Sequence, residues 1–267
     1  MGEDIAQVMV GSAIVVAALM LTVWTVSVVR KDASLVDIFW GFGFVVIAWV
    51  SFALGDGNDT RKLIIAVLAS VWGLRLTLHI GRRNLGKGED YRYRAMRRAH
   101  PDNFGRWTLV NVYGLQGVLM YAVSLPLQMA QVTGGPDGLE IVGYIGIALW
   151  VIGFAFEATG DRQLNRFKAD AANKGKVMDR GLWRYTRHPN YFGDSVVWWG
   201  HFLIAAANPV MIWTVVSPLI MTFLLTRVSG VPLLERSMAR RKPGYTEYMA
   251  RTSGFFPLPP RKGDAGR

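Results

Sequence analysis

The sequence contains no cysteine among its 267 residues. Disulfide bonds, thiolate metal sites and thiol nucleophiles are therefore excluded. It has only 4 histidines, and they form no HExxH pair of the kind that binds catalytic zinc. The phosphate loop GxxxxGK[ST], the nucleophile elbow GxSxG and a glycine-rich dinucleotide turn after a strand are missing as well. We therefore expect no metal site, and no chemistry that depends on these familiar motifs.

Acidic residues are scarce, with 19 Asp and Glu against 30 Lys and Arg, a formal net charge of +11. The basic residues do not form one patch of the kind that binds nucleic acid. They lie between long apolar runs, and 27 of the 30 follow the first, third, fifth or seventh run. Lys and Arg are enriched in the cytoplasmic loops of membrane proteins. We therefore expect the C-terminus in the cytoplasm, the N-terminus outside, and no nucleic-acid partner.

The apolar content is high, at 51% of residues. Runs of about 18 or more apolar residues are long enough to cross the hydrocarbon core of a membrane as helices. Seven candidate runs occur, at 8–28, 35–54, 63–80, 108–131, 139–158, 192–207 and 209–226. The acidic start MGEDIAQ lacks the basic region of a signal peptide. The sequence predicts an all-α, polytopic integral membrane helix bundle of about seven transmembrane helices.

The polar segments differ in length, and this difference bears on where function lies. The stretches 81–107, 159–191 and 227–267 are long, whereas the connections on the opposite side are short. Long loops are more often functional than short connectors. Because no linker or repeat divides the chain, we expect a single membrane domain over 1–267 whose chemistry faces the cytoplasm.

The stretch 184–194, RYTRHPNYFGD, places polar residues directly before an apolar run. A helix that begins at its proline puts Asn190 and Asp194 on one face. Ionisable groups inside membrane helices usually face the bundle interior and are functional. Arg184 and Arg187 lie beside the helix N-terminus, which attracts anions. We expect an anionic-cofactor site here; in the plainer interpretation, the arginines only follow the charge rule and the polar residues fix helix packing.

The end of the fifth run, FEATGDRQLNRFKAD, offers a second set of polar side chains. Glu157 and Asp161 are four residues apart, so they share a helical face and can hold ribose hydroxyls or an amide. Arg166 and Lys168 can contact phosphates. An ordinary solvated helix end with pairs at i,i+4 spacing explains the same pattern, and both interpretations remain open.

The stretch SLVD at 34–37 has two interpretations. The spacing of Ser34 and Asp37 is close to that of a capping box at the start of the second run. Alternatively, Asp37 lies one turn inside the run, near Trp40. A carboxylic acid in an apolar pocket can stay protonated and donate a proton or hydrogen bond to a substrate oxygen.

The third run contains Arg75 and His79, which are four apart on one face. Arg75 either snorkels towards the membrane surface or pairs with Asp37 or a ligand. The loop that follows, GEDYRYRAMRR at 88–98, alternates aromatic and basic residues. It is either a lid over a nucleotide or a surface for lipid headgroups.

The segment after the seventh run begins near Glu235 and continues into a basic cluster that includes Arg241. Tyr245 and Tyr248 follow at three-residue spacing. A basic cluster beneath a bilayer usually contacts headgroups, but the neighbouring tyrosines equally favour adenine or phosphate binding.

These segments resemble the steroid 5α-reductase superfamily, in particular its bacterial branch of short membrane proteins. The resemblance rests on SLVDIFWGFGF, WGLRLTLHIGRRNLGKGEDYRYRAMR, RGLWRYTRHPNYFGD and YTEYMARTSGFFPLPP, and therefore covers most of the chain. RHPNYFGD is similar to the Asn-Tyr-x-Gly-Asp stretch of the sterol C14 and Δ7 reductases. Members of the superfamily bind NADPH within a membrane helix bundle and reduce an activated carbon–carbon double bond by hydride transfer.

The resemblance implies substrate-side helices in 1–131 and a cofactor-binding half in 132–267. It implies that NADPH is the cofactor. Together with the patterns above, it gives these expected cofactor-binding residues: Glu157, Asp161, Arg166, Lys168, Arg187, His188, Asn190, Tyr191, Asp194, Glu235, Arg241, Tyr245 and Tyr248.

On the substrate side, the resemblance puts Asp37 where the steroid enzymes have a glutamate that polarises the 3-keto oxygen. It puts Trp72 where they have a tyrosine, a departure from the family pattern because an indole cannot donate a phenolic proton. Arg75 matches a basic position of the family. We expect Asp37, Trp72 and Arg75 to be catalytic, and Trp40 and His79 to contact the substrate.

The expected protein is an NADPH-dependent oxidoreductase acting on CH–CH bonds, of the 3-oxo-5α-steroid 4-dehydrogenase type, in a bacterial inner membrane. Its expected partners are a steroid or related hydrophobic enone and membrane lipid, without a protein partner. Isoprenylcysteine carboxyl methyltransferases, which use S-adenosylmethionine, share RHPxYxG and are the alternative. Asp194, and Glu235 in place of a Glu-Glu pair, favour the reductase. A non-enzymatic lipid-binding or transport protein is the third possibility, although the sequence shows no repeats.

Overall fold

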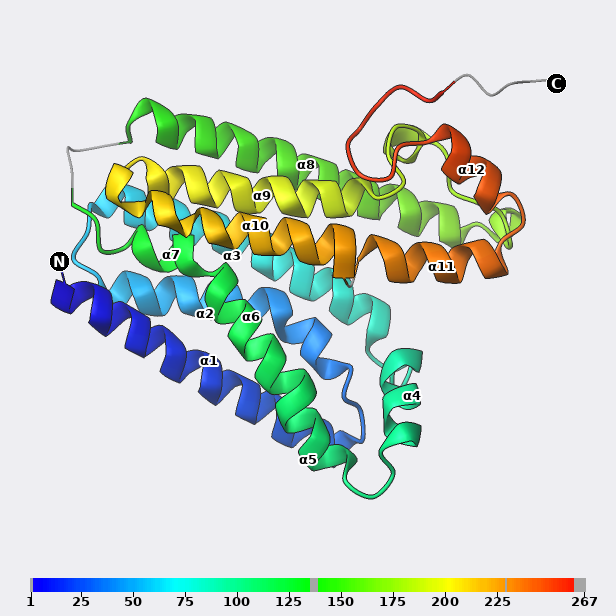
Figure 1. Ribbon diagram of the computed structural model, residues 1–267, viewed down its shortest axis with the longest axis horizontal. Coiled ribbons are helices and arrows are strands. Elements are labelled where there is room, and N and C mark those ends of the chain that lie inside the picture. Colours follow the sequence, from blue (N-terminus) through cyan, green and yellow to red (C-terminus); the bar gives the residue numbers. More distant parts are fainter. Residues whose placement is uncertain (1, 135–138, 229, 262–267) are drawn as a thin grey trace. The chain divides into compact units, whose positions relative to one another are not determined.

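The computed structural model describes residues 2–134, 139–228 and 230–261. All regular elements in these ranges are helices, apart from one isolated bridge between Thr186 and Ser253 (Figure 1). The prediction of an all-α protein is confirmed. The chain forms two compact units, of which the first comprises Met1–Gly143 and Ile204–Ser217 and the second Tyr144–Leu203 and Pro218–Arg267.

The first unit contains three long helices followed by shorter ones. They are α1 (Gly2–Arg30), α2 (Leu35–Leu54), α3 (Asp59–Asn84), α4 (Tyr91–Ala99), α5 (Phe104–Thr108), η1 (Leu109–Gly114), α6 (Leu115–Val123), α7 (Leu125–Met129) and η4 (Pro209–Val215). The starts of α3 and α4 have the side-chain caps that their sequences favour. Asn58 accepts a hydrogen bond from the Arg61 N–H (3.0 Å) at the start of α3, and Asp90 accepts one from the Arg92 N–H (2.9 Å) at the start of α4.

Helices α2 and α3 approach each other at two glycines. A Cβ atom on Gly41 would lie 2.4 Å from the Gly73 carbonyl oxygen, and one on Gly73 would lie 2.5 Å from the Gly41 carbonyl oxygen. Only glycine permits so close a contact between two backbones, as is common where membrane helices cross. The contact fixes the two helices that carry Asp37 and Trp72.

The predicted run 108–131 is not one helix. It is divided among α5, η1, α6 and α7. The segment η1 is a π-helix, and α6 ends at Val123. Pro126, in the first turn of α7, has no N–H to continue a helix from the preceding turn.

The second unit is built on two long helices. Its helices are α8 (Ile141–Ala169), η2 (Ala171–Asn173), η3 (Gly181–Arg184), α9 (Pro189–Ala206), α10 (Val216–Phe223), η5 (Leu224–Val228), α11 (Val231–Arg241) and α12 (Tyr245–Arg251), of which α8, α9 and α10 extend by a few residues into the first unit. As predicted, α9 begins at the proline of RHPNYFGD, where a missing N–H costs nothing.

Glycines at seven-residue spacing bring α8 against α9. A Cβ on Gly153 would lie 2.6 Å from the Gly193 carbonyl oxygen, and one on Gly200 would lie 2.8 Å from the Gly146 carbonyl oxygen. A Cβ on Gly160 would meet the Pro189 ring at 3.1 Å. A repeat of seven keeps a contact on one face of a helix over several turns. The sequence analysis did not note this pattern.

Five helices in the described part of the chain are long and apolar enough to cross a membrane. They are Gly2–Arg30, Leu35–Leu54, Asp59–Asn84, Ile141–Ala169 and Pro209–Arg241. These are helices typical of an integral membrane protein. By length and apolar content the predicted count of seven is not reached, because the run 108–131 is broken and α9 is made more polar by residues such as Asn190, Asp194 and His201.

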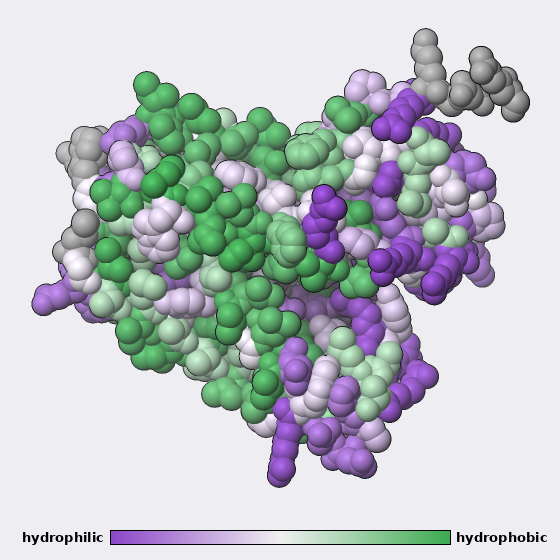
Figure 2. Space-filling model, viewed as in Figure 1, coloured by the Kyte–Doolittle hydropathy of each residue, from purple (hydrophilic) through white to green (hydrophobic). Residues whose placement is uncertain are grey.

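Apolar side chains are exposed along the long helices, where lipid would cover them. In the first unit, Ile14 on α1 and Val118 on α6 are 65% and 67% exposed; in the second, Val151 on α8 and Phe223 on α10 are 52% and 58% exposed. Figure 2 shows apolar residues over these helices. Hydrophilic residues gather around α4 in the first unit and around α11 and α12 in the second.

Candidate functional site

In the second unit, a carboxylate and an amide from different helices meet beside the glycine contact. The Asn190 Nδ2 on α9 donates a hydrogen bond to the Asp161 Oδ1 on α8, at 3.2 Å. Asp161 is 7% exposed, and Glu157, one turn earlier on the same face, is 3% exposed. Because both carboxylates are buried, α8 here is not the ordinary solvated helix end that was one of the two interpretations. Asp194 lies one turn further along α9.

A three-residue cluster joins the start of α9 to α11. The Glu235 Oε1 accepts a hydrogen bond from the Arg187 Nε (2.7 Å) and lies 3.0 Å from the His188 Nε2. Burial lowers the pKa of His188, since its side chain is 1% exposed, and the nearby Arg187 acts in the same direction, while Glu235 opposes the shift. The Tyr191 ring stacks on the His188 ring with centroids 5.4 Å apart. Through Glu235, α11 therefore holds the start of the RHPNYFGD segment in place.

The C-terminal segment is attached to the same turn. The Arg187 Nη1 donates hydrogen bonds to the carbonyl oxygens of Met249, at 3.0 Å, and Thr252. The Tyr248 hydroxyl donates to the Trp183 carbonyl oxygen. Burial, followed by the negative charge of Glu235, raises the pKa of Tyr245 to about 12, so this phenol stays neutral. These contacts hold α12 against the segment before α9.

The basic residues that we expected to contact phosphate do not lie together in the structure. The Arg187 guanidinium is 12% exposed and already engaged by Glu235 and two carbonyl groups. Arg166 and Arg241 are exposed, and Arg241 bonds to Ser237 on its own helix. Lys168 instead lines an open hollow of about 240 Å³ together with Lys174 and Lys242. We call this hollow, with its three lysines, the lysine hollow. It provides a basic surface near the end of α8.

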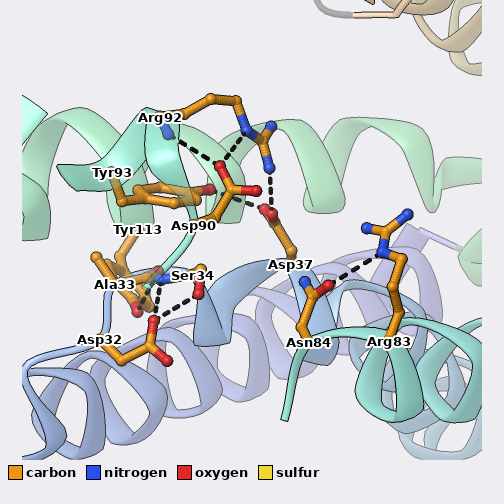
Figure 3. A network of polar contacts seen from close by, with 10 residues as sticks. All are labelled: Asp32, Ala33, Ser34, Asp37, Arg83, Asn84, Asp90, Arg92, Tyr93 and Tyr113. Carbon is orange, nitrogen blue, oxygen red and sulfur yellow. Dashed lines mark hydrogen bonds and ion pairs between the residues drawn. The ribbon is translucent and has the colours of Figure 1, made fainter. Parts of the chain in front are cut away.

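In the first unit, Asp37 lies within a polar network between α2 and α4 (Figure 3). Its Oδ1 accepts a hydrogen bond from the Tyr93 hydroxyl at 2.8 Å, and its Oδ2 accepts one from the Arg92 Nη2 at 2.7 Å. The surroundings of this carboxylate are therefore polar, unlike the apolar pocket that we expected. The capping-box interpretation is wrong, because the Ser34 hydroxyl donates to Asp32 and caps no helical N–H.

Further ion pairs attach α4 to the start of α2. The Glu89 carboxylate accepts two hydrogen bonds from Arg97 (2.8 and 2.9 Å) and one from the Ala33 N–H (2.9 Å). Burial of the Tyr93 side chain, together with the charge of Asp37, raises the pKa of Tyr93 well above its usual range. Burial opposes the charge of Arg92, but the nearby Asp37 and Asp90 outweigh it and raise the pKa of Arg92. The Tyr93 phenol therefore stays neutral within this network.

The other predicted substrate residues lie on α2 and α3. Trp72, which is fully buried, has its ring 5.7 Å from that of Phe44, which in turn lies 5.2 Å from the Trp40 ring. Arg75 and His79 are half-buried and share a face of α3 with Trp72. The structure thus brings Trp40 and Trp72 to one aromatic cluster.

Four residues of this network were not predicted as site residues: Glu89, Arg92, Tyr93 and Arg97. The alternation in GEDYRYRAMRR was noted as a lid or a headgroup surface, but the two acidic residues before α4 were not matched with a partner. They were the available signal, since carboxylates beside arginines commonly form pairs. Among the described residues, no group of three His, Asp or Glu side chains could hold a metal ion.

No solved structure matches the chain. Over 261 residues the sequence is 25% identical to the uncharacterized protein C594.04c of Schizosaccharomyces pombe (strain 972 / ATCC 24843), a match that covers 88% of this chain and 75% of the yeast protein. The family described as "Protein of unknown function (DUF1295)" matches residues 23–252, which include both Asp37 and the RHPNYFGD segment. The chain belongs to the DUF1295 family.

Proposed function

We propose that the protein is an NADPH-dependent membrane reductase that transfers hydride to an activated carbon–carbon double bond of a steroid or other hydrophobic enone. The observation that carries the proposal is the hydrogen bond between the buried Asp161 and the half-buried Asn190, beside the RHPNYFGD segment. This segment resembles the Asn-Tyr-x-Gly-Asp stretch of sterol reductases. Buried polar pairs in membrane helices are expensive and are usually functional.

The chemistry of the second unit fits NADPH. Asp161 and Asn190 offer an acceptor and a donor for hydroxyl and amide groups, and the lysine hollow offers positive charge for phosphates. Arg187 is unsuited to a phosphate, because its donors bind Glu235 and the C-terminal carbonyls, and we assign it a positioning role. When bound, NADPH supplies the hydride that goes to the β-carbon of the enone.

The first unit, considered by itself, contains a hydrogen-bond donor of the kind that polarises the carbonyl of an enone. The Tyr93 hydroxyl is a neutral phenol whose single hydrogen goes to Asp37, so it donates to a substrate carbonyl oxygen only by exchanging that partner. Trp72 has no phenolic proton to supply. Arg92 holds Asp37 in place through an ion pair at 2.7 Å. A hydrogen bond to the carbonyl oxygen stabilises the negative charge that develops there as the double bond is reduced. The α-carbon then takes a proton from water.

The distribution of basic residues supports a position in a bacterial inner membrane with the N-terminus outside and the C-terminus in the cytoplasm. In this orientation α4, the lysine hollow and the C-terminal segment face the cytoplasm, where NADPH is available. We retain seven membrane crossings as the prediction for this topology.

The direct test is to titrate the detergent-purified protein with NADPH and, in parallel, with S-adenosylmethionine. For Asn190→Ala we expect about tenfold weaker NADPH binding, because the buried Asp161 loses a hydrogen-bond partner. The matched control is Asn111→Ala, which removes an exposed asparagine of the first unit and should leave binding unchanged.

The outcomes separate the functional classes. Binding of S-adenosylmethionine without NADPH would identify a methyltransferase and refute the reductase. Binding of neither would point to a lipid-binding or transport protein. Equal weakening by Asn190→Ala and Asn111→Ala would remove the Asp161–Asn190 pair from the site.

A further inference from the structure

We propose that the outer face of α4, together with the turn that leads into α5, binds the headgroup of an anionic phospholipid. We call this surface the α4–α5 face and define it by Arg94, Arg98 and Arg106 with the turn 101–105. The proposal concerns a surface of the first unit and does not depend on the reductase assignment.

The α4–α5 face lies where the apolar surface of the first unit ends. Helix α1 packs against η1 and α6. Exposed apolar side chains continue along both partners as far as Val29, 78% exposed, and Val110, 67% exposed. Basic residues follow within four positions, at Arg30 on α1 and Arg106 on α5. An abrupt change from exposed apolar to basic residues is expected at the depth of lipid headgroups.

The arginines of α4 divide into two sets. Arg92 and Arg97 turn inward, to Asp37 and Glu89. Arg94 and Arg98 are four apart, so they share one face of the helix. Together with Arg106 they are exposed, and their guanidinium groups form no hydrogen bond or ion pair with any residue that the structure describes. The outward set is therefore available for an external anion.

The turn between α4 and α5 forms an open hollow of about 510 Å³, lined by Arg97, residues 101–105 and Arg106. Asp102 is its acidic member, so the hollow is not uniformly basic. Two contacts hold the turn in place: the Trp24 Nε1 donates to the Gly105 carbonyl oxygen (2.9 Å), and the His100 and Trp107 rings stack at 4.2 Å. Tryptophans are enriched at the membrane interface, which agrees with this depth.

The same contacts argue against a lid over a nucleotide. A lid must open, but α4 is attached to the start of α2 through Asp37 and Glu89, and its turn is attached to α1 through Trp24. A fixed basic surface beside exposed apolar helices suits a ligand that is itself part of the membrane. The phosphate of an anionic phospholipid supplies the charge, and its acyl chains cover the apolar side chains of α1 and η1.

The experiment uses the full chain in detergent, titrated with phosphatidylglycerol and with zwitterionic phosphatidylcholine. Bound lipid is counted by native mass spectrometry. We expect the protein to retain phosphatidylglycerol preferentially. The triple variant R94Q/R98Q/R106Q should weaken this binding by at least about tenfold, because each basic residue near an anionic surface contributes to the attraction.

Two matched variants separate the α4–α5 face from net charge and from misfolding. R162Q/R180Q/R236Q removes three exposed arginines of the second unit and should bind phosphatidylglycerol as the wild type does. R94K/R98K/R106K keeps the charge and should retain most of the binding. Equal losses in both glutamine variants, or unchanged binding in R94Q/R98Q/R106Q, would refute the proposal. Displacement of the lipid by NADPH would identify a nucleotide surface instead, whereas insensitivity to NADPH and to inorganic phosphate supports a lipid site.

Discussion

At the scale of single residues, several side chains have partners in the structure that differ from the predicted ones, and their roles differ accordingly. Asp37 was predicted as an acid in an apolar environment, but it binds Arg92 and Tyr93. Arg187 was predicted to meet phosphate, but it holds Glu235 and the C-terminal segment. In both cases the partner lies 48 or more residues away. Sequence spacing reports only on neighbours along one helix, so it could not provide these partners.

The Tyr93–Asp37 hydrogen bond can be tested by Tyr93→Phe. The change removes one donor from a carboxylate that is only 17% exposed, which should destabilise the protein by about 1–3 kcal/mol. Thermal unfolding of the detergent-purified protein measures the effect, as a midpoint several degrees lower. Tyr144→Phe is the control, because Tyr144 is 61% exposed. A midpoint that Tyr93→Phe leaves unchanged would show that the hydrogen bond contributes little to stability.

At the scale of helices, long apolar periodicity predicted α1, α2, α3 and α8 well, because a run of about 20 apolar residues has few alternatives in a membrane. The prediction of a single helix over 108–131 was wrong. Its composition is apolar, but it contains a π-helix and a break before Pro126, and neither changes the average hydropathy. The stripe of Asn190 and Asp194 on α9 was expected, whereas the glycine contact that brings α8 to it was not.

The contact between α8 and α9 gives a prediction for Gly153→Ala. Its new Cβ would lie 2.6 Å from the Gly193 carbonyl oxygen and from the Val197 backbone nitrogen, so the helices must separate. We expect a loss of about 1–3 kcal/mol, as for other overpacked interiors, measured as a lower thermal midpoint.

Gly81→Ala is the matched control. Its Cβ would have no neighbour nearer than 3.7 Å, and alanine favours a helix over glycine. The midpoint should therefore stay the same or rise slightly. Similar decreases in both variants would mean that the close approach at Gly153 is unimportant.

At the scale of the whole molecule, charge asymmetry and apolar runs together predicted a helical membrane protein, and the structure supports that class. The two compact units were not predicted, because the first unit includes Ile204–Ser217 from late in the chain. Sequence patterns report on neighbouring residues, so none of them indicates that a late segment packs with the N-terminal helices. The attachment of the C-terminal segment was also invisible in the sequence, since most of it depends on backbone carbonyl groups, which every residue has.

The C-terminal attachment predicts the behaviour of Arg187→Lys. A lysine keeps the charge but cannot bind Glu235 and two carbonyl groups at once. We expect α12 to detach more often, so trypsin should cleave after Arg240 and Arg241, at the end of α11, faster in time-course electrophoresis. Arg184→Lys, at an exposed position, should be cleaved at the wild-type rate. Identical rates for Arg187→Lys and wild type would contradict the positioning role.

The attachment of Arg187 also has a consequence for how the protein is made. Its partners Glu235, Met249 and Thr252 lie 48, 62 and 65 residues later in the chain. During synthesis, RHPNYFGD therefore enters the membrane before the residues that hold it exist. Its final geometry is completed only after Thr252 has left the ribosome. A premature stop between Asp194 and Thr252 would disturb a segment whose own codons are intact.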